Sequence, residues 1–265
     1  MLVDHEEGRL FAGGTALLLA MRQRMLTPSH IVYLGGVRGL SRIEYDERNG
    51  LRIGALVRHA EVADSAVVKT AYPMLADMAG RLANPQVRNV GTLAGNLCYG
   101  DPATDPPPCL MALGAQVVAV GPDGERTIEL DRFFTDYFQN ALGPGEVVTE
   151  IRVPPLQADA VGAYTRFLRT RADHRPLVGV GIVLRRAGGI CREARIAIGA
   201  SVPIPVRARR AEAFLAGKII NREVLEEAAD IAATDITPVS DSRGSEEYRR
   251  DMVRTVVFRT AANLS

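Results

Sequence analysis

Two glycine-centred segments have the residue types of an anion-binding site. The first is Ala12-Gly13-Gly14-Thr15, and the second runs from Asn89 to Asn96 and contains Gly91 and Gly95. Glycine lets the backbone approach a ligand closely, and successive N–H groups in a turn form a concave anion site. Either segment alone would more often be a structural turn, but two in one domain could hold a diphosphate between them. The pair therefore indicates a dinucleotide site, for a ligand such as FAD.

Neither segment matches a common nucleotide fingerprint. The first lacks the G-x-G-x-x-G spacing of a Rossmann site and the Gly-Lys-Thr ending of a P-loop. Asp105 follows the second segment within a proline-rich stretch. Its carboxylate could accept hydrogen bonds from ribose hydroxyls while the glycine segments bind the diphosphate.

Side chains suited to acid–base or metal chemistry are scattered along the chain. The four histidines have neither metal-ligand spacing nor a neighbouring nucleophile, and we expect each to have a surface or structural role: His5, His30, His59 and His174. Asp101 and Asp105 are four residues apart, but the prolines between them prevent a shared helical face. The sequence thus predicts no catalytic residue and no metal site.

Composition narrows the class of protein. A net charge of +1 gives no electrostatic case for nucleic-acid binding. Three cysteines without C-x-x-C spacing argue against a disulfide framework, a zinc site or an iron–sulfur cluster held by this chain alone. No apolar run is long enough to span a membrane, and no secretory leader is visible. We expect a soluble, cytoplasmic protein.

The first sixty residues have a strand–helix–strand rhythm typical of a small α/β subdomain. Residues 1–8 are typical of the end of a helix. Thr15 is the expected N-cap of a helix over 16–25, with Leu17, Leu18 and Leu19 facing the core. Expected strands are residues 9–12, 30–34 and 51–55.

The middle of the chain predicts a buried helix and an antiparallel hairpin. Helical spacing of Leu75, Met78, Ala79 and Leu82 predicts that one face of a helix over 72–82 is buried. The prolines predict extended chain over 101–108, ahead of a short helix over 110–113. The remaining predicted strands are 115–120, 125–130 and 147–153, the first two forming a hairpin.

The last hundred or so residues indicate a separate α+β domain. Three longer strands come first and two amphipathic helices follow, an order typical of α+β folds. The strands are expected at 160–168, 177–185 and 194–201, with residues 187–189 as a hairpin turn, and the helices at 222–233 and 246–262.

In their order along the chain, these motifs resemble the medium, FAD-binding subunit of molybdenum hydroxylases, the family of the xanthine dehydrogenase and carbon monoxide dehydrogenase medium subunits. Each matching piece is weak alone, whereas the ordered set covers nearly the whole chain. The pieces are 12–15, 53–56, 87–92, 95–96, 101–107, 110–115, 145–146, 151–154, 171–173 and 248–250.

The resemblance implies an α+β fold. Its FAD-binding domain would consist of two α/β subdomains similar to the vanillyl-alcohol-oxidase/PCMH fold, over residues 1–58 and 59–156. A C-terminal three-stranded sheet with helices would follow over 157–265. Because the chain starts later than its relatives, the first subdomain is expected to lack its first strand and helix.

The resemblance also implies which residues bind FAD. In the family, backbone at Ala12, Gly13, Gly14 and Thr15 holds the diphosphate, and Gly91, Thr92, Gly95 and Asn96 add contacts. Asp105 would be the polar anchor on the flavin side, Val148 an apolar contact of the isoalloxazine ring, and Arg166 a basic residue near the flavin.

The implied activity is electron transfer within a larger oxidoreductase. A large partner subunit would hold molybdopterin and the organic substrate, and a small partner two [2Fe-2S] clusters, in a dimer of heterotrimers. Electrons would pass through FAD in this chain to an external acceptor. The sequence leaves the organic substrate and the acceptor open.

Two departures from the family pattern keep alternatives open. Ala16 stands where relatives usually have an acidic residue, and Ala94 replaces the first glycine of a pair. If position 94 needed a positive φ, an alanine there would be strained by roughly 1 kcal/mol or more. The alternatives are a structural subunit that has lost FAD, and a stand-alone FAD reductase similar to UDP-N-acetylmuramate dehydrogenase.

Overall fold

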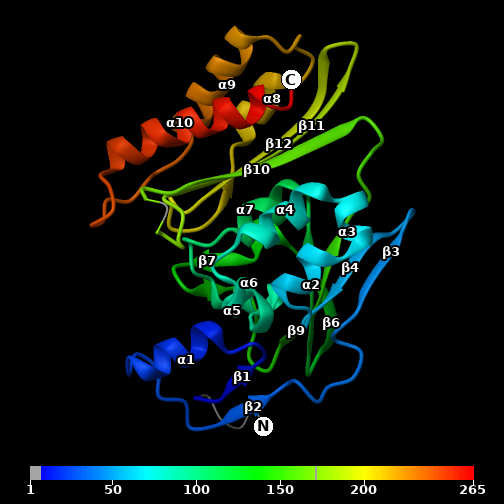
Figure 1. Ribbon diagram of the computed structural model, residues 1–265, viewed down its shortest axis with the longest axis vertical. Coiled ribbons are helices and arrows are strands. Elements are labelled where there is room, and N and C mark those ends of the chain that lie inside the picture. Colours follow the sequence, from blue (N-terminus) through cyan, green and yellow to red (C-terminus); the bar gives the residue numbers. More distant parts are fainter. Residues whose placement is uncertain (1–6, 171) are drawn as a thin grey trace.

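The computed structural model describes residues 7–170 and 172–265. A small β–α–β unit lies at one end, a five-stranded sheet with short helices in the middle, and a second sheet under three helices at the other end (Figure 1). The expected helix end at residues 1–8 lies mostly outside the described residues. None of the helices in the described ranges is both long enough and apolar enough to cross a membrane.

The first unit is a two-stranded parallel sheet joined by one helix. Strand β1 (Arg9–Phe11) pairs with β2 (Ile31–Tyr33), and α1 (Thr15–Arg22) connects them. The helix is shorter than predicted, and Gly14, not Thr15, is its N-cap. The prediction that Leu18 and Leu19 face the core was wrong, since their side chains are 51% and 54% exposed. Two strands offer too little surface to bury a whole helix face.

The middle sheet is antiparallel in the order β3-β4-β9-β5-β6. Its first two strands, β3 and β4, lie before residue 58, and β4 pairs with β9, which lies after it. The predicted subdomain boundary at residue 58 therefore divides one sheet, and the pairing places β3 and β4 in the second subdomain. The hairpin of β5 and β6 has the predicted two-residue turn, between Gly121 and Gly124. The strands are β3 (Ile43–Asp46), β4 (Gly50–Gly54), β5 (Gln116–Gly121), β6 (Gly124–Glu129) and β9 (Val147–Val153).

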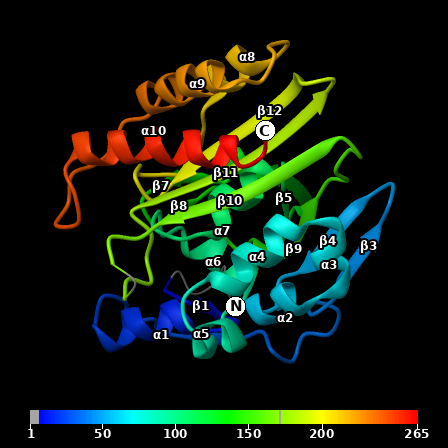
Figure 2. The ribbon, with the colours of Figure 1, turned by 45° about the horizontal axis from the view of Figure 1, so that its top comes forward.

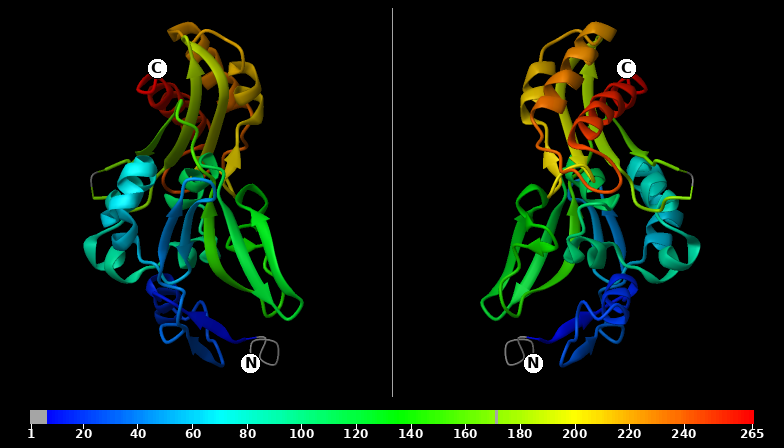
Figure 3. Two further views of the ribbon diagram at one scale, coloured as in Figure 1. Left: turned by 90° about the vertical axis from the view of Figure 1, so that its right-hand side faces the viewer. Right: turned by 90° about the vertical axis from the view of Figure 1, so that its left-hand side faces the viewer.

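Short helices cover one face of this sheet (Figure 3). They are α2 (His59–Asp64), α3 (Ala66–Ala71), α4 (Pro73–Arg81), α5 (Pro85–Val90), α6 (Leu93–Tyr99) and α7 (Pro106–Ala112). The four predicted core residues at 75, 78, 79 and 82 are all buried. A 3-10 turn (Leu130–Arg132) and the small hairpin β7 (Phe134–Asp136) and β8 (Gln139–Asn140) precede β9.

Helix α7 corrects the prediction of extended chain over residues 101–108. Three prolines, Pro106 to Pro108, form its first turn. Proline is tolerated there because the first N–H groups of a helix have no intrahelical partner, and its fixed φ suits a helix.

The C-terminal domain has three long antiparallel strands, as expected, and a short fourth: β10 (Ala160–Phe167), β11 (Val178–Ala187), β12 (Ile190–Gly199) and β13 (Val206–Arg207). One face of the sheet packs against α8 (Arg209–Leu215) and α10 (Glu246–Ala262), and α9 (Arg222–Thr234) packs against these two helices. The other face of the sheet lies against α4 and α7 (Figure 2). The predicted boundary at residue 156 lies between β9 and β10 and stays a prediction.

Glycines on the C-terminal sheet allow α7 to approach it. A Cβ at Gly181 would lie 2.5 Å from the Pro108 carbonyl oxygen and 3.0 Å from the Ala112 Cβ. A Cβ at Gly199 would lie 3.0 Å from the Pro108 ring. The bare backbone of β11 and β12 therefore sets how closely the two domains pack.

We expect Gly181→Ala to lower the free energy of unfolding by about 1–3 kcal/mol, because the new methyl group overpacks this contact. Gly80→Ala is the control. Gly80 lies within α4, where a Cβ meets only the Ala63 Cβ at 3.8 Å. The control should gain about 0.5–1 kcal/mol in helix stability. Denaturant unfolding measures both, and an unchanged midpoint in Gly181→Ala would contradict the packing argument.

Candidate cofactor site

The two glycine segments lie in direct contact. A Cβ at Gly13 would overlap the carbonyl oxygen of Val90 and lie 2.8 Å from the Gly91 Cα and 3.0 Å from the Thr92 nitrogen. Only glycine can occupy position 13 without displacing the second segment. A Cβ at Gly91 would in turn lie 3.2 Å from the Thr15 hydroxyl oxygen. The fold thus joins two segments that are separated by more than one quarter of the chain.

The first segment leads into a helix whose start has no side-chain cap. Gly14 is the N-cap of α1, with φ of 70°, and no side chain accepts a hydrogen bond from the first turn. The first N–H groups of a helix have no intrahelical partner, and they favour an anion. The first turn also contains no acidic residue. Ala16 therefore leaves the end of α1 without a carboxylate that would repel a phosphate.

The second segment is mostly helical, which corrects its interpretation as a turn of bare N–H groups. Gly91 links α5 to α6, and Thr92 is the N-cap of α6. The Thr92 hydroxyl accepts a hydrogen bond from the Gly95 N–H at 3.1 Å. Asn96 follows in the same helix, where its N–H donates to the Thr92 carbonyl. Ala94 lies inside α6 with no positive φ, so the strain considered for it does not arise.

Asp105 and Arg166 also meet, and Tyr164 joins them. The buried Asp105 carboxylate accepts a hydrogen bond from the Tyr164 hydroxyl at 2.9 Å, and the Arg166 Nε lies 3.3 Å from it. Burial raises the pKa of Asp105, against the opposing effects of the Arg166 charge and the Tyr164 hydrogen bond. Sequence reasoning missed Tyr164. The signal was its position two residues before Arg166 on one strand, which places both on the same face.

Arg166 ties this cluster to two further segments. Its guanidinium donates to the Arg81 carbonyl at 2.5 Å and to the His174 carbonyl at 2.8 Å. Asp105 begins α7 and Arg166 lies on β10, so the cluster spans the two large domains. Val148 belongs to neither group. It lies on the central strand β9, and its side chain is buried in the core of the middle sheet.

His59 is a residue of this region that sequence reasoning placed only as surface or structural. It begins α2, is 2% exposed, and its N–H donates to the Gly91 carbonyl at 3.0 Å. Its ring carbon Cδ2 lies 3.3 Å from where a Gly91 Cβ would be. Burial, assisted by the nearby Arg88 charge, lowers the pKa of His59 to about 4. The His59 imidazole is therefore neutral near pH 7, and it packs against Gly91 of the second segment. No residue spacing in the sequence predicts this contact.

The comparisons with known proteins identify the family of this chain. Residues 1–156 match the family model described as the FAD binding domain in molybdopterin dehydrogenase. The chain belongs to this family of FAD-binding medium subunits. Residues 163–264 match the model of the CO dehydrogenase flavoprotein C-terminal domain. The two matches confirm the family predicted from the sequence, and the helices and sheets of the structure confirm the predicted α+β fold class.

Relatives match over nearly their whole length. The nicotine 6-hydroxylase medium subunit of Paenarthrobacter nicotinovorans is 35% identical over 98% of this chain and 90% of its own. The structure of carbon monoxide dehydrogenase from Hydrogenophaga pseudoflava matches with a TM-score of 0.93 and 35% identity, over 97% of this chain and 88% of that one. Quinoline 2-oxidoreductase from Pseudomonas putida 86 matches with a TM-score of 0.92 and 30% identity, over 99% and 90%.

We expect Gly13→Ala to weaken FAD binding by about tenfold or more, equivalent to about 1.4 kcal/mol, because the methyl group pushes the two segments apart. Gly36→Ala is the matched control, since a Cβ there has nothing within 4 Å. Flavin absorbance per purified chain measures both. Equal FAD content in both variants and the parent would contradict the contact's role.

We expect the free energy of unfolding to decrease by up to about 3 kcal/mol as the pH is lowered from 6.5 to 4, because the buried His59 resists protonation in the folded protein. The His59 imidazole binds a proton more tightly in the unfolded chain than in the folded protein. The contribution is complete above pH 6.5 and is lost as pH falls towards the folded pKa of about 4. Urea unfolding between pH 7 and 5 measures the slope. An unchanged slope in His59→Gln would contradict this.

Proposed function

We propose that this chain carries electrons between partner subunits of a molybdenum hydroxylase and an external acceptor, through an FAD held between its two glycine segments. The observation that supports this most is the contact of Gly13 with residues 90–92 beside the uncapped start of α1. That arrangement is a backbone cradle with free donors, which fits a diphosphate. FAD, when bound, supplies the redox chemistry, and the protein supplies binding and orientation.

Two groups among the proposed binding residues have separate tasks. Backbone at 12–15 and at 91–92 binds the diphosphate, with the N–H groups of α1 as donors. Asp105 and Arg166 orient the flavin side from the cluster that Tyr164 completes. We keep Gly95, Asn96 and Val148 as proposed contacts. The N–H groups of Gly95 and Asn96 are both donated to Thr92 within α6.

The proposed partners are a large molybdopterin subunit and a small subunit with two [2Fe-2S] clusters, assembled as a dimer of heterotrimers in the cytoplasm. Relatives named as medium chains of carbon monoxide dehydrogenase and glyceraldehyde dehydrogenase support a multi-subunit complex. No residue of this chain is proposed to contact the organic substrate.

The structure weighs against the loss of FAD as an alternative. The helical backbone at Ala94 removes one reason for doubting FAD binding. Ala16 removes a negative charge from the end of α1 and so favours a phosphate there. The match of residues 163–264 to the flavoprotein C-terminal model favours a subunit over a stand-alone reductase.

We expect the complex, purified through a tag on this chain, to contain one FAD for each copy of the chain, together with molybdenum and iron in the large and small partners. Acid release of the flavin measures the FAD content, and elemental analysis measures molybdenum and iron. The parent and Gly36→Ala complexes should keep FAD, and Gly13→Ala should lose it while keeping both metals. A complete complex with molybdenum and iron but without flavin would overturn the proposal.

A further inference from the structure

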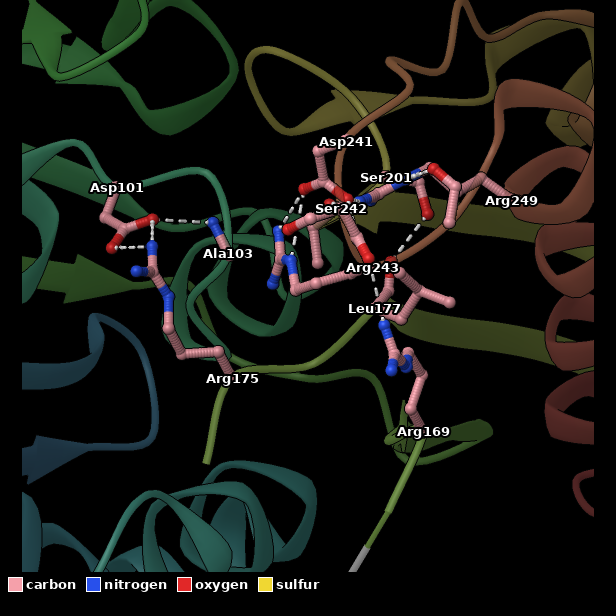
Figure 4. A network of polar contacts seen from close by, with 12 residues as sticks. Asp101, Ala103, Arg169, Arg175, Leu177, Ser201, Asp241, Ser242, Arg243 and Arg249 are labelled. Atoms are coloured by element: carbon pink, nitrogen blue, oxygen red, sulfur yellow. Dashed lines mark hydrogen bonds and ion pairs between the residues drawn. The ribbon is translucent and has the colours of Figure 1, made fainter. Parts of the chain in front are cut away.

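The segment that carries Asp105 is held from the C-terminal domain by a polar junction (Figure 4). The Arg175 guanidinium pairs with both oxygens of the buried Asp101, whose Oδ1 also accepts the Ala103 N–H at 2.9 Å. The Pro102 carbonyl, between them, accepts a hydrogen bond from the Ala200 N–H at 2.9 Å. Asp101, Pro102 and Ala103 are therefore all held by hydrogen bonds or ion pairs. Two of the groups that hold them, the Arg175 side chain and the Ala200 N–H, belong to the chain after β10.

Ala200 occupies an unusual backbone position at the end of β12. Its φ is 66°, in the left-handed region that residues other than glycine rarely adopt. Such a residue persists where its surroundings hold it. One restraint is the Pro102 hydrogen bond, and the other is on its carbonyl side, where the Arg249 Nη1 donates to the Ala200 oxygen at 2.9 Å.

Arg249 is a buried arginine in the first turn of α10. Its side chain is 2% exposed, and its Nη2 lies 2.6 Å from the Asp241 carboxylate. The Nε donates to the Gly244 carbonyl at 3.4 Å. The arginine thus holds the 241–244 turn and the Ala200 peptide in one planar fork, which a lysine could not reproduce.

We propose that Arg249 is a positioning residue for the cofactor, acting through Ala200 and Pro102 on the segment that carries Asp105. The inference rests on the proposed function, since Asp105 must face the flavin side. Asp105 lies three residues after Pro102 and begins α7, so a shift of the Ala200 turn would move the start of α7. The hydrogen bond from Tyr164 to Asp105 and the ion pair between Arg166 and Asp105 would then lose their geometry.

The neighbouring arginine provides a matched control. Arg250 donates to the carbonyls of Ala233 and Ile236 at 2.8 and 3.1 Å and pairs with Glu246. All of these contacts lie within the C-terminal domain. Arg249 and Arg250 are therefore two consecutive arginines of one helix that both bind backbone carbonyls. Only Arg249 binds a residue, Ala200, whose N–H in turn donates to Pro102 in the segment before α7.

The test compares Arg249→Met with Arg250→Met in the full chain. FAD binding is titrated by flavin fluorescence, thermal unfolding is recorded without FAD, and amide exchange is followed over residues 100–105. We expect Arg249→Met to bind FAD about tenfold more weakly, equivalent to about 1.4 kcal/mol, and to exchange faster over this segment. Arg250→Met should bind FAD like the parent at a comparable loss of Tm. Arg249→Lys and Asp241→Asn serve if Arg249→Met does not fold, and each should weaken FAD binding.

Two results would overturn the inference while leaving the proposed function intact. One is equal weakening of FAD binding in the Arg249 and Arg250 variants in proportion to their loss of Tm, which indicates general destabilisation. The other is parental FAD affinity in the Arg249 variants. Failure of the parent chain to bind FAD would instead overturn the proposed function, and the inference with it.

Discussion

The close approach of two backbones at Gly13 is the constraint on which the rest of this structure depends. A side chain at this position would collide with the Val90 carbonyl, so the first subdomain packs this closely against the second only with glycine at position 13. That contact fixes the uncapped end of α1 beside the start of α6. The small β–α–β unit has little core of its own, and this contact aligns its donors with the neighbouring subdomain.

A second constraint is that charges buried between the domains must find partners. Burying an ionised group without a partner is costly, and removing one member of such a pair leaves the other uncompensated. Asp105 meets Tyr164 and Arg166, and Asp101 meets Arg175. In each case the acid comes from the segment before α7, and its partners come from β10 or the chain after it. The C-terminal domain therefore supplies the polar surroundings of a segment that belongs to the FAD-binding domain.

Local patterns predicted most elements because periodicity and turn chemistry are read within a few residues. The buried face of α4, the β5–β6 hairpin, β9 and the two last helices followed from such signals. Predictions failed where a neighbour decided the outcome. Leu18 and Leu19 have the spacing of a core face, but only two strands lie beneath them. Strands β3 and β4 follow the β–α–β unit in sequence, yet β4 pairs with β9, almost one hundred residues later.

The sequence by itself determined the family and the identity of the two glycine segments, because ordered motifs and the need for glycine are properties of residue type. Only the tertiary structure decided that the segments touch, that the second is helical, and that His59 lies beneath Gly91. It also decided that Tyr164 completes the Asp105 cluster and that Arg249 reaches Pro102 through Ala200. These are contacts between residues distant in the chain, and their energies depend on burial and orientation, which residue spacing does not specify.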